Sequence, residues 1–283
     1  MTGSAATVLV VGGGTMGAGI AQNMAEIGVH AFVSETDPVT ADAAQDRVAD
    51  GLRRRFRAEA DMDERVAEHL ARCTITVGLP DIAPDLIVEA VPEITELKRS
   101  LLADLDRRYP DVPILASNTS SLSIDDLAAH LDRPSRFIGM HFFNPVPKSD
   151  LVELVVGADT ADVTVAATVA WVERLDKTAI VVRDSPGFAT SRLGVALGLE
   201  AIRMVEEGVA SADDIDRGMV LGYKLPIGPL RLTDLVGLDV RLKIAEHLHA
   251  TLGPRFEPPE LLRTMVADGR LGKKTGEGFH TWP

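Results

Sequence analysis

One histidine and one glutamate stand in two apolar segments that are expected to form neighbouring strands. His141 ends the first segment, 137–141, and Glu153 lies within the second, Leu151–Val156. The short connection between the segments can bring the two side chains together. An imidazole held by a carboxylate is a general base, because the carboxylate stabilises the imidazolium ion that proton transfer forms. The alternative is structural: a hydrogen-bonded core histidine and the polar position of an alternating strand.

Small polar side chains follow another expected strand, 113–116. Residues 117–121 are Ser-Asn-Thr-Ser-Ser. Ligands of open parallel sheets bind at the carboxyl ends of the strands, so these hydroxyl and amide groups can contact a cofactor or a substrate. A polar turn that caps the helix from Ile124 onward is the alternative, and the segment taken alone favours it.

The N-terminal segment has the spacing of a dinucleotide-binding turn. The apolar run 8–11 leads into Gly12-Gly13-Gly14-Thr15-Met16-Gly17, which fits G-x-G-x-x-G, and good helix formers follow over 18–27. Gly12 permits the tight turn, Gly14 lets the backbone approach a pyrophosphate, and Gly17 lets the helix pack close to the strand. The amino end of that helix directs N–H groups at the phosphates.

The expected cofactor depends on Glu35, which follows the next apolar run, 29–33. An acidic side chain there accepts hydrogen bonds from both hydroxyl groups of the adenine ribose and repels a 2′-phosphate. The sequence therefore predicts NAD rather than NADP as the cofactor. An ordinary βαβ unit with a surface glutamate is the alternative.

Strands and helices alternate in the first part of the chain, which predicts a mainly parallel sheet. Further strands are expected at 74–77, 86–88 and 179–182, with helices within 40–72 and over 95–107. Strand signals end near residue 185, and helices are expected over 189–207, from Ser211, over 232–252 and over 260–267. The sequence thus predicts an α/β Rossmann-type N-terminal domain, residues 1–185, and an all-α C-terminal domain, residues 186–283.

Charge and composition exclude several classes of protein. The 283 residues carry a net charge of −13, which argues against a nucleic-acid or anionic-membrane binder. No apolar run approaches the ~20 residues of a membrane span, and no signal peptide is expected at the N-terminus. Cys73 is the single cysteine, so no intramolecular disulfide forms, which suits a reducing cytoplasm. We therefore expect a cytoplasmic protein without a metal site.

Several motifs in one order resemble the 3-hydroxyacyl-CoA dehydrogenase family, in particular its short 3-hydroxybutyryl-CoA dehydrogenase branch. They are GGGTMGAGIAQ at 12–22, IVEAVPE at 87–93, ASNTSSL at 116–122, HFFNPVP at 141–147, DSPGF at 184–188 and GKKTGEGF at 272–279. The resemblance covers nearly the whole chain. It implies an enzyme that oxidises an (S)-3-hydroxyacyl-CoA, above all 3-hydroxybutyryl-CoA, to the 3-ketoacyl-CoA with NAD.

The resemblance also implies roles for residues at matching positions. His141 takes the proton of the 3-hydroxyl group, Glu153 orients His141, and Ser120 hydrogen-bonds the reacting oxygen. The resemblance and the glycine turn together indicate which residues bind the cofactor. They are Gly12, Gly14, Thr15, Met16, Gly17, Glu35, Glu93, Lys98, Ser120, Asn144 and Lys274.

Two positions depart from the family pattern. Glu35 replaces the usual aspartate, and because it keeps the charge we expect the preference for NAD to survive. Ser191 stands where asparagine is common, among the expected catalytic residues. Its short side chain offers one hydroxyl group, which reaches a substrate through water. The sequence therefore indicates the reaction more closely than it indicates the range of substrates.

Four arginines, Arg53, Arg54, Arg55 and Arg57, lie in the helical segment that contacts coenzyme A in the family. Guanidinium groups suit its 3′-phosphate and its pyrophosphate. The resemblance therefore implies that at least one of them binds the acyl-CoA substrate. A solvated helix face is the alternative.

Two other functions stay open at this point. One is a dehydrogenase of a free or carrier-protein-bound 3-hydroxy acid; a carrier protein shares the phosphopantetheine arm but lacks the 3′-phosphate. The other is a catalytically silent NAD-binding member, which Ser191 favours and the set Ser120, His141 and Glu153 disfavours. The resemblance further implies a homodimer formed through the C-terminal helices.

Overall fold

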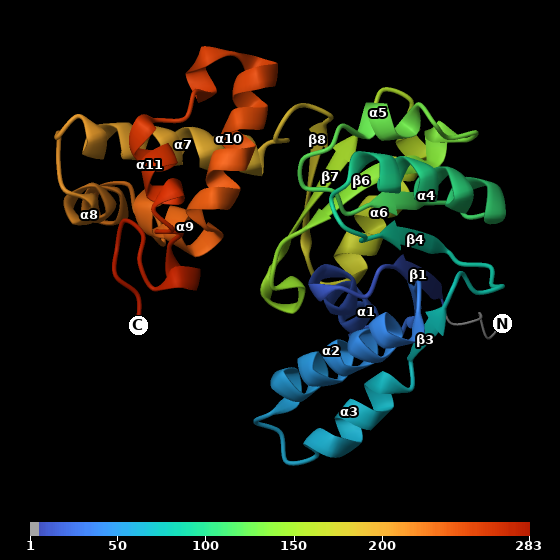
Figure 1. The fold of residues 1–283 in the computed structure, drawn as a ribbon. Coiled ribbons are helices and arrows are strands. Elements are labelled where there is room, and N and C mark those ends of the chain that lie inside the picture. Colours follow the sequence, from blue (N-terminus) through green and yellow to red (C-terminus); the bar gives the residue numbers. More distant parts are fainter. Residues whose placement is uncertain (1–5) are drawn as a thin grey trace. The chain divides into compact units, whose positions relative to one another are not determined.

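The computed structural model describes residues 6–283, which form two units that separate between Asp184 and Ser185. The first unit is built on an eight-stranded sheet (Figure 1). Its strands are β1 (Thr7–Val11), β2 (His30–Glu35), β3 (Cys73–Val77), β4 (Leu86–Glu89), β5 (Leu115–Ser117), β6 (Phe137–Phe142), β7 (Leu151–Val156) and β8 (Thr178–Arg183).

The spatial order of the strands is β3-β2-β1-β4-β5-β6-β7-β8. All neighbours pair in parallel except β6 and β7, which are antiparallel. The order reverses between β1 and β4, and open α/β sheets bind ligands at the carboxyl ends of the strands beside such a reversal. The glycine turn follows β1 directly, so it lies at this point of the sheet.

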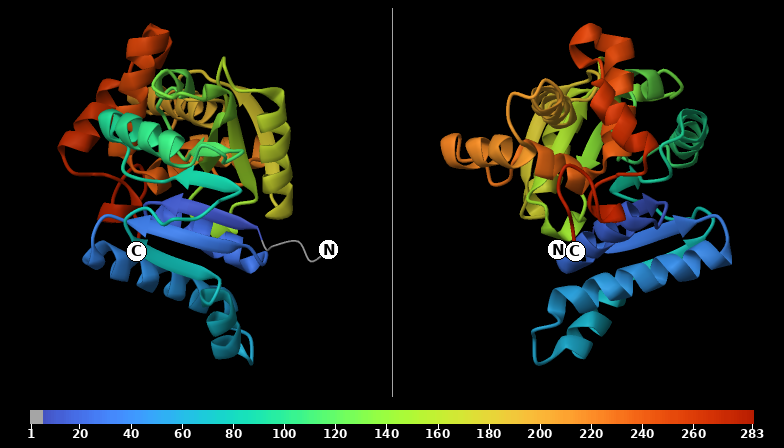
Figure 2. Two further views of the ribbon diagram at one scale, coloured as in Figure 1. Left: turned by 90° about the vertical axis from the view of Figure 1, so that its right-hand side faces the viewer. Right: turned by 60° about the vertical axis from the view of Figure 1, so that its left-hand side comes forward.

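The helices of the first unit are α1 (Thr15–Glu26), α2 (Pro38–Phe56), α3 (Met62–Leu70), α4 (Thr95–Arg108), α5 (Ile124–Ala128) and α6 (Asp162–Arg174). Asp37 begins α2, since its side chain accepts hydrogen bonds from the N–H groups of Val39 and Thr40. Helices α2 and α3 lie side by side and project from the part of the unit that β1, β2 and β3 form (Figures 1 and 2).

Parallel strands that are covered on both faces have continuous apolar sequences, and the central strands of this sheet follow this rule. Val8, Leu9 and Val10 of β1 and residues 86–88 of β4 are fully buried. Side chains of α1 and α2 pack into the same core, among them Ile20 and Leu52. This packing holds the carboxyl ends of the strands in place.

The second unit is helical, with α7 (Thr190–Glu206), α8 (Ala212–Gly222), α9 (Pro229–Val236), α10 (Leu238–Leu252) and α11 (Glu260–Ala267). Its core is a separate cluster, to which α7 contributes Leu199 and Ile202 and α10 contributes Leu248. Ser211 caps α8, because its hydroxyl group accepts a hydrogen bond from the N–H of Asp214. The Rossmann-type first unit and the helical second unit confirm the predicted fold class.

One expectation about the elements is wrong, and one helix was not predicted. The single helix expected over 232–252 is interrupted at Gly237, where a φ of 101° ends α9 and begins α10. Helix α6 was not among the expected elements, because its valines and threonines show little helical periodicity. Within residues 6–283, none of the helices combines the length and apolar character that a membrane span needs.

Candidate active site

The glycine turn is tightly packed on one side and open on the other. Gly12 has a φ of +96°, and an added Cβ there would lie 2.9 Å from the carbonyl oxygen of Ala90. A Cβ at Gly17 would collide with the carbonyl oxygen of Gly12. By contrast, nothing lies within 4 Å of the Cβ position of Gly14, which precedes Thr15 at the amino end of α1. The turn thus fits a phosphate group that approaches the backbone at Gly14.

Glu35 is held against this turn. Its Oε1 accepts a hydrogen bond from the N–H of Gly13 at 2.5 Å. Arg47 of α2 donates to the carbonyl oxygen of Gly13 at 3.2 Å, which adds a second tether. The carboxylate at the end of β2 matches the ribose of an adenosine diphosphate, and the turn after β1 matches its phosphates. The residues present therefore fit NAD.

His141 and Glu153 face one another across the antiparallel pair β6 and β7. Nδ1 of His141 lies 3.1 Å from Oε2 of Glu153, and both residues are buried. The ring of Phe143 lies against the imidazole, with 4.5 Å between the ring centroids. Because β6 runs parallel to β5, β4 and β1, His141 lies at the same edge of the sheet as the glycine turn.

Glu93 organises the turn that carries Ser120. Its Oε1 accepts hydrogen bonds from the Thr119 hydroxyl group at 2.6 Å, the Ser120 N–H at 2.9 Å and the Ser121 N–H at 3.1 Å. The hydroxyl group of Ser120 lies 3.3 Å from the same oxygen, and Ser120 is exposed. The carboxylate of Glu93 thus fixes the backbone from which the Ser120 side chain projects.

Lys98 is buried beneath Glu93. Its Nζ lies 2.7 Å from Oε1 of Glu89 and 3.2 Å from Oε2 of Glu93. Burial opposes the ionisation of Glu93, but the positive charge of Lys98 and the hydrogen bonds from Thr119 and Ser120 outweigh it. The pKa of Glu93 therefore lies below its ordinary value. Glu93 is ionised at neutral pH and acts as a fixed hydrogen-bond acceptor.

The sequence interpretation missed Glu89, and it did not predict the contacts within the protein that Ser117 and Asn118 make. Glu89, which is fully buried, also accepts a hydrogen bond from the Ser117 hydroxyl group at 2.5 Å. Oδ1 of Asn118 accepts one from the N–H of Phe142 at 2.9 Å, which ties the end of β5 to the residue after His141. The sequence does indicate Glu89, because it is an ionisable residue at the end of the apolar run Ile87-Val88.

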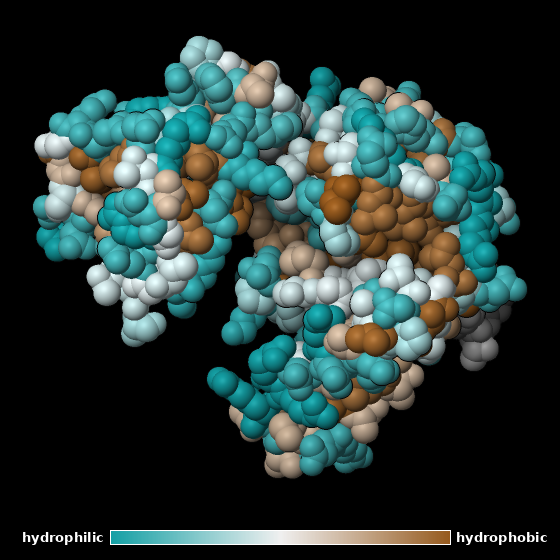
Figure 3. All heavy atoms as spheres, viewed as in Figure 1, coloured by the Kyte–Doolittle hydropathy of each residue, from teal (hydrophilic) through white to brown (hydrophobic). Residues whose placement is uncertain are grey.

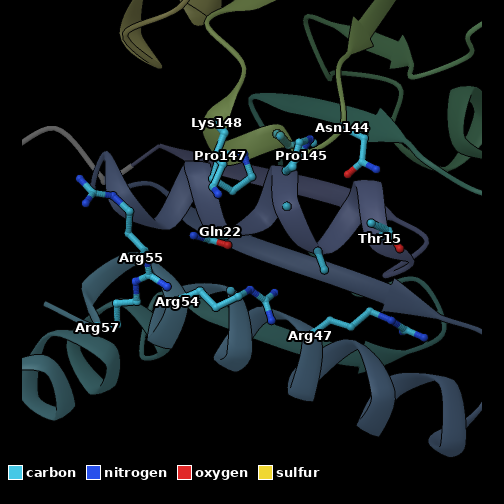
Figure 4. Close-up of a pocket in the computed structure, with 14 residues that line it drawn as sticks. Thr15, Gln22, Arg47, Arg54, Arg55, Arg57, Asn144, Pro145, Pro147 and Lys148 are labelled. Atoms are coloured by element: carbon cyan, nitrogen blue, oxygen red, sulfur yellow. The ribbon is translucent and has the colours of Figure 1, made fainter. Parts of the chain in front are cut away.

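A cavity of about 670 Å³ lies between α1, α2 and residues 144–148 (Figure 4). Figure 4 shows cationic side chains of α2 on one side and Asn144 on the other. Arg53 does not line this cavity and pairs instead with Asp50 at 2.9 Å. The polar and charged side chains that line it are Thr15, Gln22, Arg47, Arg54, Arg55, Arg57, Asn144 and Lys148.

Two further residues of interest belong to the second unit. Lys274 lies in the short 3₁₀ helix Lys273–Thr275, and its Nζ contacts the two carboxylate oxygens of Asp239 at 2.5 and 2.6 Å. Ser191 lies in the first turn of α7 and is half-buried. Met16, expected in the cofactor site, lies in the first turn of α1 in the first unit.

Family models match both units. The model of the 3-hydroxyacyl-CoA dehydrogenase NAD binding domain matches residues 7–185, and the model of the C-terminal domain of the same enzymes matches residues 187–282. The chain belongs to the 3-hydroxyacyl-CoA dehydrogenase family. These matches confirm three predictions, namely the family, NAD as the cofactor and the activity of an oxidoreductase.

Individual relatives agree with this assignment over almost the full chain. The probable 3-hydroxybutyryl-CoA dehydrogenase of Bacillus subtilis is 41% identical over 277 residues, which is 97% of this chain and 96% of the relative. The mitochondrial hydroxyacyl-coenzyme A dehydrogenase of Rattus norvegicus is 38% identical over 285 residues, 97% of this chain and 90% of the relative. The crystal structure of (S)-3-hydroxybutyryl-CoA dehydrogenase from Ralstonia eutropha superposes with a TM-score of 0.93 at 41% identity, covering 99% of this chain and 100% of that one.

Proposed function

We propose that this chain oxidises (S)-3-hydroxyacyl-CoA to 3-ketoacyl-CoA with NAD, with 3-hydroxybutyryl-CoA as the simplest substrate and His141 as the general base. The observation that carries the proposal is the contact of 3.1 Å between His141 and the buried Glu153, at the edge of the sheet that holds the dinucleotide turn. The names of the relatives from Bacillus subtilis and Ralstonia eutropha support the substrate class.

The roles of His141 and Glu153 follow from the hydrogen bond that joins them. The neutral ring donates its Nδ1–H to Glu153, which leaves the lone pair on Nε2. In the proposed reaction Nε2 takes the proton of the 3-hydroxyl group while the C3–H bond breaks and the C3–O bond becomes a carbonyl. Bound NAD would supply the acceptor for the hydride from C3, with both electrons of that bond. Glu153 then stabilises the imidazolium ion.

The remaining site residues are proposed to bind and orient. Ser120, on the turn that Glu93 fixes, hydrogen-bonds the reacting oxygen and the cofactor. Glu93 and Asn144 contact the cofactor, and the buried Lys98 acts through Glu93 as a positioning residue. The contacts of Lys274 with the cofactor and of Ser191 with the substrate rest on the family resemblance.

The arginine-lined cavity is proposed to hold the phosphates of coenzyme A. Arg54, Arg55 and Arg57 reach it from the end of α2, and Arg47, two helical turns before Arg54, extends the same cationic surface (Figure 4). Such clusters bind phosphate through short, charge-assisted hydrogen bonds. Arg53, which pairs with Asp50 outside the cavity, is left out of this proposal.

The double substitution Arg54→Gln with Arg57→Gln should raise KM for acetoacetyl-CoA at least tenfold, because one lost charged hydrogen bond is worth ~1.5–3 kcal/mol. KM for acetoacetyl-pantetheine, which lacks the phosphates, should stay unchanged. Steady-state kinetics with NADH measures both values. Arg53→Gln is the matched control and should leave both unchanged. Equal effects on the two thioesters would contradict a coenzyme A site and favour a carrier-protein substrate.

We also propose that the chain forms a homodimer through its second unit and works in a reducing, cytoplasmic compartment. Apolar side chains reach the surface of this unit (Figure 3), and the most exposed ones include Leu193, Val209, Leu221 and Tyr223. Larger apolar patches mark interaction sites. The free cysteine Cys73, which forms no disulfide within residues 6–283, supports a reducing compartment.

Light scattering should give a particle of twice the 30.3 kDa mass of one chain. Leu193→Lys should shift the mass toward that of the monomer, because a charge there opposes burial in an interface. Leu97→Lys, at a partly exposed apolar position of α4 in the first unit, is the control and should not change the mass. A monomeric wild-type chain would contradict the dimer.

A further inference from the structure

Gln22 is the last residue of the motif that begins with the glycine turn, and its side chain lines the arginine-lined cavity of the first unit (Figure 4). The residue is only 3% exposed. Polar side chains that are buried to this degree are normally hydrogen-bonded, and an amide has both a donor end and an acceptor end to satisfy. The partners at the two ends of the Gln22 amide therefore indicate its role.

The donor end of this amide is engaged within α1. Nε2 of Gln22 donates a hydrogen bond to Oε1 of Glu26 at 2.8 Å. The other carboxylate oxygen of Glu26 lies 3.8 Å from Nε of Arg55, which also lines the cavity. Within residues 6–283, no group donates a hydrogen bond to Oε1 of Gln22. The amide thus offers the cavity a hydrogen-bond acceptor.

Gly51 of α2 makes room for this acceptor. A Cβ added at Gly51 would collide with Oε1 of Gln22 and would lie 3.1 Å from its Cδ. Glycine inside a helix is less favourable than alanine, so its presence here has a packing reason. The missing side chain lets the Gln22 amide lie between α1 and α2, where both residues line the cavity.

One face of α1 forms a wall of the cavity. Its lining residues are spaced i, i+3, i+4 and i+7, and they are Thr15, Ala18, Gly19 and Gln22. About 10.5 Å of helix axis separates the first from the last. The two residues between them are small, so a slender chain can lie along this face of the helix.

The two ends of this face have different neighbours. Gln22 lies toward the end of the cavity where Arg55 and Arg57 project, and Asn144 lies toward the end at Thr15 (Figure 4). Asn144 follows His141, the proposed general base, by three residues. A molecule whose phosphates lie at the arginines and whose reacting end lies beyond Asn144 therefore passes Gln22.

We propose that Oε1 of Gln22 accepts a hydrogen bond from an amide N–H of the pantetheine arm of coenzyme A. This inference rests on the proposed function, because it takes the phosphates of coenzyme A to lie at the arginines. The arm joins the phosphates to the thioester sulfur and carries two amide groups. Gln22 lies at the arginine end of the wall, so it contacts the amide that is nearer to the phosphates.

A coenzyme A analogue in which this amide is replaced by an ester tests the proposal, because the ester has no N–H to donate. In the wild-type chain, KM for the acetoacetyl thioester of the analogue should be about two- to tenfold higher than KM for acetoacetyl-CoA, the usual worth of one hydrogen bond. Gln22→Met keeps the length of the side chain and removes the acceptor. It should raise KM for acetoacetyl-CoA by the same factor and abolish the difference between the two thioesters.

A second variant reaches the same oxygen from the other helix. Gly51→Ala places a methyl group against Oε1 of Gln22, and it should also reduce the difference between the thioesters. Gln45→Met, at an exposed glutamine of α2 that does not line the cavity, is the matched control and should keep the difference. Inhibition by adenosine 3′,5′-bisphosphate, which has phosphates but no pantetheine arm, should be the same in all of these chains.

The outcomes separate this inference from the proposed function. Equal KM values for the amide and the ester in a wild-type chain that turns over acetoacetyl-CoA would overturn the role of Gln22 and leave the proposed function standing. Weaker inhibition by the bisphosphate in Gln22→Met would also overturn that role, since the effect would then pass through Glu26 and Arg55. A wild-type chain without turnover of acetoacetyl-CoA would contradict the proposed function itself.

Discussion

Replacement of His141 by alanine should lower kcat for the oxidation of 3-hydroxybutyryl-CoA by about 10²–10⁴-fold, the usual contribution of a positioned general base. The affinity for NADH should stay close to that of the wild-type chain, because the glycine turn and Glu35 lie on β1 and β2, away from β6. Stopped-flow turnover and fluorescence titration of NADH measure the two effects separately.

The exposed His130 provides the control for this substitution. His130→Ala should leave both turnover and NADH affinity unchanged. Wild-type turnover in His141→Ala would contradict the assignment of the base. A parallel loss of NADH affinity would equally contradict it, since the effect would then be structural.

Replacement of Lys98 by methionine should lower the free energy of unfolding by about 3–5 kcal/mol, the cost of breaking a buried ion pair by removing one partner. Lys98 and Glu89 are 1% and 0% exposed, and their charged atoms are 2.7 Å apart. Without Lys98, the carboxylate of Glu89 is left buried without its cation, and Glu93 loses its main stabilising charge. Urea unfolding measures the loss.

The pH dependence of this variant has a defined sign. Lys98 lowers the pKa of Glu93 in the wild-type chain, and the stability that this adds is present above the ordinary carboxyl pKa and is lost as the pH falls. The loss of stability in Lys98→Met should therefore be larger at neutral pH than at acidic pH. The added substitution Glu89→Gln should recover part of it. Lys243→Met, at an exposed lysine, is the control, and a loss in Lys98→Met no larger than in this control would contradict the account.

The parts of the site that depend on local sequence could be predicted. The glycine turn, α1 and Glu35 follow one another within a single βαβ unit. His141 and Glu153 lie in strands joined by a short connection, and the antiparallel register places them opposite each other. Short sequence separation therefore made both predictions possible.

The parts of the site that depend on packing between distant segments could not be predicted from the sequence. The pairing of Glu89 with Lys98 joins the end of β4 to α4, and neither residue type alone indicates it. Arg54 lines the cavity and Arg53 does not, because successive residues of a helix point in different directions. The spacing of Arg47 and Arg54, which are seven residues apart and share a face of α2, could have indicated which arginines line the cavity. The break at Gly237 depends on a positive φ that glycine permits but does not impose.

One assay tests the central claim most directly. The purified chain is mixed with NADH and acetoacetyl-CoA and the absorbance of the reduced nicotinamide is followed, with NADPH and with free acetoacetate as parallel controls. Rapid loss of NADH with the thioester alone is the predicted result, since it requires the reaction, the choice of cofactor at Glu35 and the CoA thioester together. No loss of NADH with the thioester, although the chain binds NADH, would contradict it.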